Sequence, residues 1–268
     1  MPEQRDDGSA AIASVAGSAS AEDSASPANS TNAANSALAD FKVGVDNVIF
    51  SVDIDRGRVL VLSVMRDDEP AIGQWCLPGT LVRQGESLED AAYRVLSEKI
   101  RVSNLYLEQL YTFGGPDRDP REAPDSYNER YLSVSYFALV RYDEAQLIAE
   151  GVSGIAWYPL AGVPPLAFDH DRIVEYGYRR LRNKLEYSPV AFEVLPDRFT
   201  LGELFQLYTA VLGDNFSDYS NFRTRVLRLG ILRDTGEKAS RGAGRPASLY
   251  VFDREAFAPL ADRPMVFI

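Results

Sequence analysis

The sequence predicts an α/β fold in two parts: a sandwich of strands around a helix, and then a helix–turn–helix unit that ends in a β-hairpin. Three observations predict it. Runs rich in β-branched residues flank a loop and an amphipathic helix at 75–101. Two capped helical patterns begin at about residue 200. Two strand-like runs, joined by a glycine-rich basic loop, follow these helices.

Length and composition limit the class of protein. The 268 residues suggest about two domains, and the single cysteine, Cys76, excludes an intramolecular disulfide and a zinc cluster. The net charge of -11 argues against a wholly basic nucleic-acid binder, so any such function must be local. No apolar run approaches the roughly 20 residues that span a bilayer. The first residues are acidic and lack a secretory pattern, so we expect a cytoplasmic protein with no membrane partner.

Residues 1–40 differ from the rest of the chain. They are dominated by Ala, Ser, Asn, Asp and Gly, and no aromatic residue precedes Phe41. Such a segment buries too little apolar area to offset its ordering entropy, which predicts a disordered, solvated tail. We place the first folded part at 41–168, a linker helix at 169–190 and the second folded part at 191–268.

Runs of β-branched residues predict the strands of the first part. The first two runs are separated by the turn Asp55-Arg56-Gly57 and are expected to form a hairpin. A loop and helix follow, and then three further strands. The strands are expected at 43–54, 58–65, 105–113, 130–140 and 155–160.

The helix within 75–101 has clear signals. Ser87 is a good N-cap, and Glu89 and Asp90 suit the first turn. Apolar residues recur at helical spacing and predict one buried stripe. The stripe comprises Leu88, Ala91, Ala92, Val95, Leu96 and Ile100.

This loop and helix resemble the Nudix box, in which helix carboxylates hold a divalent metal on a nucleoside diphosphate. The resemblance implies a Nudix-like α/β/α sandwich. The residues that fit are Leu77, Pro78, Gly79, Gly85, Glu86, Ala91, Ala92, Arg94, Leu96 and Glu98. The departures are Thr80 for a loop glycine, Arg83 for the loop glutamate, Val95 and Lys99 for two helix glutamates, and Arg101 for the closing glycine.

These departures weaken the expected metal chemistry. Val95, Glu98 and Lys99 are spaced i, i+3 and i+4, so we expect them on one side of the helix. One carboxylate beside an ammonium and an isopropyl group makes a poor magnesium site, and metal activation of water is not expected. We interpret this part as a binding module rather than an enzyme, with no catalytic residue, metal or cofactor. The alternative is an active pyrophosphatase with a regulatory C-terminal part.

A loop at 113–130 supplies a candidate ligand contact. Its segment 117–121, Asp-Arg-Asp-Pro-Arg, is similar to a loop of Nudix proteins that handle ADP-ribose. Arg118 and Arg121 offer forked hydrogen bonds to phosphate or carboxylate. The alternative is a surface loop whose charges are merely solvated.

A basic helix is expected at 170–185. Ile173, Tyr176, Leu181 and Leu185 lie roughly on one side of it, so we expect it to pack between the two folded parts. His170 is the only histidine in the chain. We interpret it as a loop or helix-start residue rather than a catalytic one.

Two helices open the second part. The first begins with the capping box Thr200-Leu201-Gly202-Glu203 and ends at Gly213. The second is expected at 220–230, with Ser220 as its cap and Gly230 as its stop. An apolar back and a polar front suit such a helix to a major groove. The back is Phe222, Val226 and Leu229, and the front is Asn221, Thr224, Arg225 and Arg228.

The strand-like runs at 231–234 and 248–252 complete the layout of a winged helix. The basic loop between them, the wing, carries Lys238, Arg241 and Arg245, close to phosphate or a minor groove. Residues 221–245 carry a local charge of +5 in an acidic chain, as expected for DNA binding. The alternative is a winged helix that contacts another protein.

The C-terminal pattern also resembles one family. FTLGELFQLYTAVLG, NFRTRVL, TGE and GRPASLY follow, in order, the pattern of the Nudix-related transcriptional regulators of NAD metabolism, the NrtR family. The resemblance covers about 41–265. It implies a Nudix-like sensor of ADP-ribose or a related NAD metabolite, joined to a winged helix that represses NAD biosynthesis or salvage genes as a homodimer on palindromic operator DNA. A sugar sensor of the same architecture and a protein-interaction scaffold are the other hypotheses.

These hypotheses assign roles to particular residues. The effector pyrophosphate is expected against Arg83, Arg118 and Arg121, with Glu86 and Glu98 shaping the loop and helix. Base or groove contacts are expected from Asn221, Thr224, Arg225 and Arg228, and phosphate or minor-groove contacts from Arg223, Lys238, Arg241 and Arg245.

Overall fold

The computed structural model describes most of the chain beyond the predicted tail. Residues 1–39 of the predicted tail, Arg241 and the tip of the wing lie outside the described residues. None of the helices in the described part combines the length and hydropathy that a bilayer crossing requires. The described residues are 40–101, 105–116, 118–122, 129–150, 152–213, 216–240 and 245–260.

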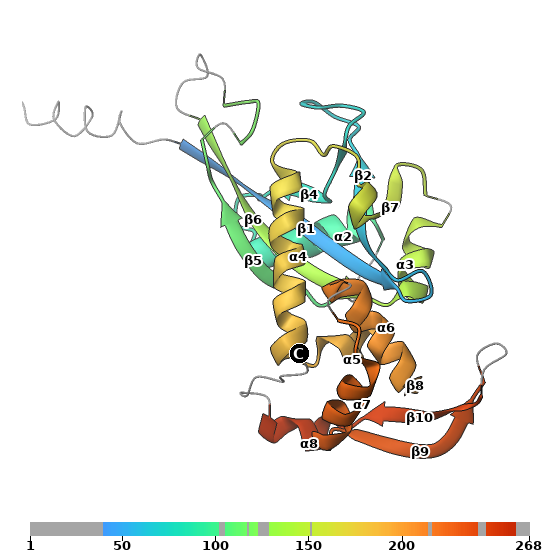
Figure 1. The fold of residues 1–268 in the computed structure, drawn as a ribbon. Coiled ribbons are helices and arrows are strands. Elements are labelled where there is room, and N and C mark those ends of the chain that lie inside the picture. Colours follow the sequence, from blue (N-terminus) through green and yellow to red (C-terminus); the bar gives the residue numbers. More distant parts are fainter. Residues whose placement is uncertain are drawn as a thin grey trace, which may run out of the picture. The chain divides into compact units, whose positions relative to one another are not determined.

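A seven-stranded mixed sheet forms the first part (Figure 1). Its strands are β1 (Asp40–Asp53), β2 (Arg58–Met65), β3 (Trp75–Cys76), β4 (Gly79–Leu81), β5 (Glu108–Phe113), β6 (Glu129–Val140) and β7 (Ile155–Pro159). The order β3–β2–β1–β6–β5 has β4 paired to β1 and β7 paired to β2. β1 and β2 form the expected antiparallel hairpin, whereas β1 and β6 run parallel.

Helices cover both faces of this sheet (Figure 1). α2 (Leu88–Lys99) and α3 (Tyr142–Ala149) pack on one face, and α4 (His170–Tyr187) packs on the other. Side chains of β1 alternate between the two sides, so Ile49 joins the core under α2 while Val48 and Phe50 join the core under α4. Ser87 caps α2 as expected, accepting a hydrogen bond from the Asp90 backbone N–H. No sequence pattern predicted α3, in which only Ala145 is buried.

The second part has the layout of a winged helix. A three-stranded sheet, ordered β8–β10–β9, lies beside its helices. The sequence pattern predicted the two main helices and the hairpin. The elements are α5 (Val190–Val194), β8 (Phe199–Thr200), α6 (Leu201–Leu212), α7 (Tyr219–Arg228), β9 (Leu232–Ala239), β10 (Ala247–Phe252) and α8 (Arg254–Phe257). A short 3-10 helix, η2 (Ala258–Leu260), follows α8, and another, η1 (Leu160–Gly162), follows β7 in the first part.

The predicted ends of α6 are confirmed, but the predicted cap of α7 is wrong. Thr200 and Glu203 form both bonds of the capping box, and Gly213 ends α6. The cap of α7 is Asp218, whose carboxylate accepts from the Asn221 backbone N–H at 2.9 Å. Ser220 already lies inside the helix, because Asp218 reaches the third amide of the first turn.

The loop of the wing is shorter than the sequence predicted. Residues 235–239, expected in the loop, belong to β9 and pair with the start of β10. The left-handed backbone of Gly236 (φ 76°) and a register shift between Ser248 and Tyr250 accommodate the irregular pairing. Ladder hydrogen bonds therefore offset the poor strand propensity of this glycine-containing run.

Helix α4 packs between the two parts, as expected. Gly177 lets it approach the sheet closely, since a Cβ there would lie 2.9 Å from Cγ1 of Val48. The Tyr178 hydroxyl donates to the Val211 carbonyl of α6 at 2.7 Å. The Tyr208 hydroxyl donates to the Leu185 carbonyl at 3.1 Å. One helix is thus fixed to both the sheet and the winged helix.

Replacing Leu181 should show how much α4 contributes to stability. Leu181 is fully buried, so Leu181→Ala should lower the free energy of unfolding by about 2–5 kcal/mol through lost burial and the cavity left behind. Urea denaturation measures it, with the exposed Asn183→Ala as the control. Equal effects of the two substitutions would contradict this role of α4.

Candidate functional site

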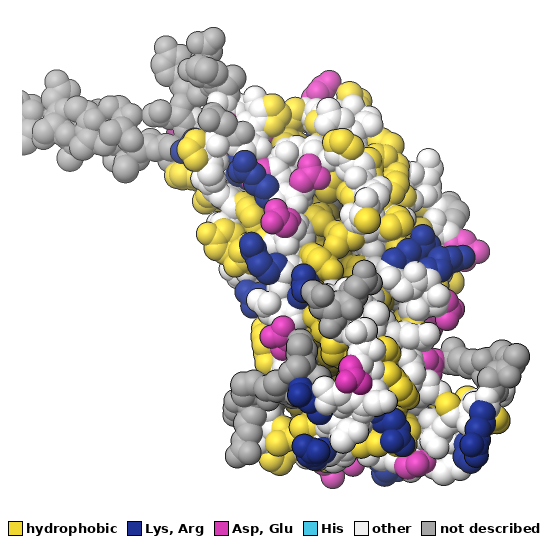
Figure 2. Space-filling view, viewed as in Figure 1, with side chains coloured by type: hydrophobic (Ala, Val, Ile, Leu, Met, Phe, Trp, Pro, Cys, Tyr) yellow, Lys and Arg dark blue, Asp and Glu magenta, His cyan; other side chains and the backbone are white. Residues whose placement is uncertain are grey.

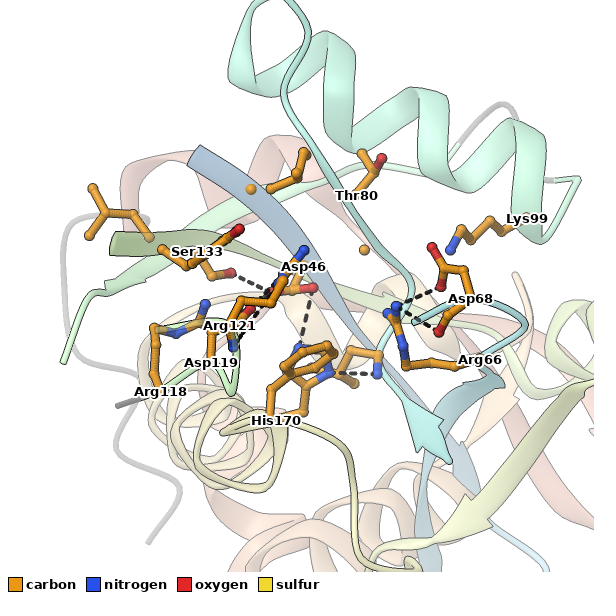
Figure 3. A pocket seen from close by; sticks show the side chains of 17 residues that line it. Asp46, Arg66, Asp68, Thr80, Lys99, Arg118, Asp119, Arg121, Ser133 and His170 are labelled. Atoms are coloured by element: carbon orange, nitrogen blue, oxygen red, sulfur yellow. Dashed lines mark hydrogen bonds and ion pairs between the residues drawn. The ribbon is translucent and has the colours of Figure 1, made fainter. Parts of the chain in front are cut away.

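A pocket of about 270 Å³ opens between β1, the loop after β3 and the first turn of α4 (Figure 3). Both charged and aromatic side chains line it. Arg118 and Arg121, two of the five predicted effector contacts, are among them. The lining comprises Gly44, Asp46, Arg66, Asp68, Leu77, Gly79, Thr80, Leu81, Lys99, Arg118, Asp119, Arg121, Tyr131, Leu132, Ser133, Phe168 and His170.

Asp46 lies at the floor of the pocket and is almost fully buried. Its carboxylate accepts from the Ser133 hydroxyl at 2.5 Å and lies 3.5 Å from Nε2 of His170 and 3.9 Å from Nη2 of Arg118. Burial alone would raise the pKa of Asp46, but the interactions with His170, Ser133 and Arg118 outweigh burial and lower it. The Asp46 carboxylate therefore places a fixed negative charge at the floor of the pocket.

Gly79 lies directly over Asp46. A Cβ at this position would come within 1.9 Å of Oδ1 of Asp46 and 2.9 Å of the Val45 carbonyl oxygen. The Nudix-like glycine that the sequence retains is thus required by close packing of the loop on β1. Any side chain here would displace the buried carboxylate.

His170 is the first residue of α4, as the helix-start interpretation predicted. It is 4% exposed, and its Nδ1 accepts the Leu77 backbone N–H at 2.9 Å. Nδ1 is therefore unprotonated, and Nε2, which faces Asp46, is the nitrogen that carries the proton. His170 joins the loop after β3 to the start of α4, a role that sequence alone did not reveal.

Arg118 is held by Asp169, and Arg121 is held by Asp119, which lines the pocket with both arginines (Figure 3). Arg118 donates to Asp169 through Nη2 at 2.6 Å and Nε at 3.2 Å. Arg121 forms a similar fork with Asp119, and its guanidinium lies 4.0 Å over the Tyr131 ring. Burial opposes ionisation of Asp119, but the Arg121 hydrogen bonds hold its pKa below the usual range.

The other three predicted effector contacts form a second cluster around Arg94. The Arg94 guanidinium donates hydrogen bonds to the Glu86 carboxylate at 2.6 and 2.9 Å and lies 3.6 Å from the Glu98 carboxylate. Arg83 lies 3.8 Å from Glu98. Arg83, Glu86 and Glu98 do not line the pocket. The structure therefore separates Arg118 and Arg121 from the rest of the predicted set.

The three Nudix positions of the helix differ in burial. Val95 is 1% exposed and belongs to the core under α2, whereas Glu98 and Lys99 are exposed. They keep the i, i+3, i+4 spacing of one continuous α-helix, and Val95 continues the apolar stripe as predicted. Lys99 lines the pocket, and Glu98 faces the Arg94 cluster.

These donors do not fit a divalent metal. The two glutamates retained from the Nudix box, Glu86 and Glu98, already pair with the Arg94 guanidinium. A magnesium ion would need oxygen ligands that Arg94 now occupies. Within the described ranges, no group of three His, Cys, Asp or Glu residues is arranged to hold a metal ion.

The predicted DNA contacts lie on α7 and the hairpin. Phe222 and Val226 are buried, which turns the opposite side of α7 outward. In Figure 2, lysine and arginine side chains are scattered over the part of the view where α7, β9 and β10 lie in Figure 1. Asn221, Arg223, Thr224, Arg228, Lys238 and Arg245 are exposed, and Arg225 is half-buried.

Sequence reasoning missed three polar residues that organise the pocket, two acids and a serine. Asp46, Asp169 and Ser133 come from distant segments and were not predicted as site residues. Asp46 had a detectable signal, since it interrupts the apolar pattern of β1. An ionisable residue in a strand buried on both faces needs a partner, and such a partner marks a site.

The Glu86–Arg94 pair should make stability depend on pH. Hydrogen bonds from Arg94 and from the Arg83 backbone lower the pKa of Glu86 from 4.5 to about 2. The stabilisation is therefore complete above about pH 4.5 and disappears as the pH falls through about 2. Glu86→Gln should lower the melting temperature at pH 7, with a difference from the parent that shrinks below pH 4.5.

Thermal melts between pH 7 and 3 measure this difference. Glu186→Gln, on the exposed side of α4, is the control, since Glu186 has no hydrogen bond or ion pair with the described residues. A difference that grows towards low pH would refute the assignment.

Comparisons with known proteins agree with this architecture. Residues 41–177 match the NUDIX domain, and residues 187–268 match the AraR C-terminal winged HTH domain. The chain is 34% identical over 212 residues to the ADPR responsive transcriptional repressor NtrR of Acinetobacter baylyi, covering 78% of this chain and 80% of that protein. It is 28% identical over 123 residues to an ADP-ribose pyrophosphatase of Methanocaldococcus jannaschii, covering 46% of this chain and 68% of that enzyme.

A solved structure extends the likeness to both parts. Shewanella oneidensis NrtR complexed with a 27mer DNA is similar with a TM-score of 0.67 and 37% identity, over 80% of this chain and 94% of that chain. The two domain matches and the long alignment with a repressor show that this chain belongs to the NrtR family, the Nudix-related transcriptional regulators.

Proposed function

We propose that this protein is a transcriptional repressor of NAD biosynthesis or salvage genes, whose Nudix-like part senses ADP-ribose or a related NAD metabolite without hydrolysing it. One observation carries the proposal: the first turn of α4 lines the arginine-rich pocket, and the same helix packs on α6 of the winged helix. The relatives support it, since the Acinetobacter protein is an ADPR responsive repressor and the Shewanella protein forms a complex with DNA.

For the effector, we assign the diphosphate to Arg118 and Arg121. Both guanidinium groups reach the pocket, and each is held in place by an acid. Forked donors of this kind suit phosphate oxygens. Arg83 is predominantly exposed and outside the pocket lining, so its contact with the effector, and the shaping roles of Glu86 and Glu98, stay predictions.

For DNA, we assign α7 to the major groove and the hairpin to phosphate or the minor groove. α7 places an apolar side in the core and Asn221, Thr224 and Arg228 outside. A homodimer would carry two such helices to the half-sites of a palindromic operator, about one or two helical turns apart. We place this DNA-binding domain at 191–268 and the sensor at 41–168, joined by the linker helix at 169–190.

A second candidate function is hydrolysis of ADP-ribose, favoured by the likeness to the archaeal pyrophosphatase. The donor set argues for binding instead. Glu86 and Glu98 both neutralise Arg94, and Val95 lies in the core. Water activation by a metal would require carboxylates free to face the phosphates.

Substitutions of exposed residues in the winged helix should distinguish the residues that read bases from those that contact phosphate. Arg228→Ala should weaken binding to a duplex selected from a random pool by about 1–3 kcal/mol and relax its sequence preference. Lys238→Ala should weaken all duplexes similarly and flatten the dependence of affinity on salt. Fluorescence anisotropy at several salt concentrations measures both. Arg141→Ala, in the Nudix-like part, is the control, and an equal loss there would refute the assignment to α7.

Titration of ADP-ribose into the complex of the protein with the selected duplex tests the effector assignment. ADP-ribose should release the DNA, because a ligand that favours the free conformation shifts the population away from the bound one. Chromatography of the same mixture with magnesium should show intact ADP-ribose. Unchanged DNA affinity would remove ADP-ribose as the effector, and sustained turnover would establish the hydrolase instead.

A further inference from the structure

Lys99 differs from the other cations that line the pocket. Arg66 donates to Asp68 and to the Pro70 carbonyl, Arg118 is paired with Asp169, and Arg121 is paired with Asp119. The side chain of Lys99, the last residue of α2, has no hydrogen bond or ion pair within the part of the chain that the structure describes. Figure 3 shows it across the pocket from Arg118 and Arg121, beyond Thr80.

An anionic ligand needs positive charge that is not already neutralised. A diphosphate carries about two negative charges, and the acids of the lining, Asp46, Asp68 and Asp119, oppose it. The three arginines of the lining are matched by Asp68, Asp169 and Asp119, so the ammonium of Lys99 is the cation of the lining that remains, and Asp46 is the remaining acid. It offers three donors on a flexible stem that can follow the phosphate oxygens.

The position of Lys99 also opposes binding of a divalent cation, the usual counter-ion of a diphosphate. A divalent cation near the end of α2 would meet an ammonium group, and the nearby carboxylates Glu86 and Glu98 are tied to Arg94. Lys99 and Arg66 also border a neighbouring hollow of about 440 Å³, so the side chain has room to move towards either space. Movement of this exposed side chain has little cost in packing.

We infer that Lys99 neutralises the diphosphate of the effector directly, so that the pocket binds a nucleoside diphosphate without a divalent metal. This inference rests on the proposed function, because it concerns the same ligand. It makes the lysine a specificity residue: it favours free diphosphates and disfavours those that arrive as magnesium complexes.

Calorimetric titration of the full chain with ADP-ribose, in EDTA and in magnesium chloride, tests the inference. The parent protein should bind at least as tightly in EDTA as in magnesium. Lys99→Met should bind about tenfold more weakly or worse in EDTA, since a charge-assisted contact is lost, and Lys99→Arg should retain most of the affinity. Lys99→Glu should bind most weakly in EDTA and should regain affinity when magnesium is added.

Matched controls keep the outcomes separate. Lys42→Met, which removes an exposed lysine outside the pocket lining, should bind ADP-ribose like the parent, and unchanged melting temperatures would show that the variants fold. Binding by the parent that requires magnesium, or parent-like binding by Lys99→Met, would overturn the inference while leaving the sensor proposal intact. Absence of ADP-ribose binding by the parent in either buffer would overturn both.

Discussion

The ion pair between Arg118 and Asp169 joins two segments that are 51 residues apart in the chain. Both side chains are nearly buried, so the pair is poorly screened and leaving either partner alone would be costly. Asp169 directly precedes α4, and α4 continues into the core of the winged helix. The pocket wall and the position of the DNA-binding part therefore depend on one buried contact and on the stiff helix that follows it.

The departures from the Nudix box do more than remove carboxylates. At positions 83 and 99 a positively charged side chain replaces a glutamate of the family pattern. The helix keeps its cap and its apolar stripe, which serve the fold. Arg94, which the box retains, pairs with Glu86 and Glu98, and Lys99, in place of a helix glutamate, brings a cation to the pocket. The stripe faces the core and the largely buried Glu86–Arg94 pair adds to stability, while Lys99 faces the pocket, so different residues of the box serve the fold and the ligand.

Local signals predicted the fold well, since capping boxes and apolar alternation depend on neighbouring residues. The hairpin of β1 and β2 and the cap of α6 followed from such patterns. The burial of Val95 in the apolar stripe of α2 is confirmed, whereas the meeting of Lys99 with Arg118 and Arg121 at one pocket depends on packing against the sheet and was not predictable. The site was predicted only in part: Arg118 came from a loop motif, but its partners Asp46 and Asp169 converge from separate segments only in the folded chain.

Coupling between ligand and DNA requires that the ligand distinguish two arrangements of the protein. Arg118 provides a physical basis, since a phosphate that takes one of its donors competes with Asp169, the residue at the start of α4. An acid that loses its partner in a buried site is destabilised, and a displacement of α4 would relieve this. Because hydrogen bonds at Tyr178 and Leu185 join α4 to α6, such a displacement would also move the winged helix. The rigidity that stabilises the fold would then link the charge in the pocket to the DNA-binding part.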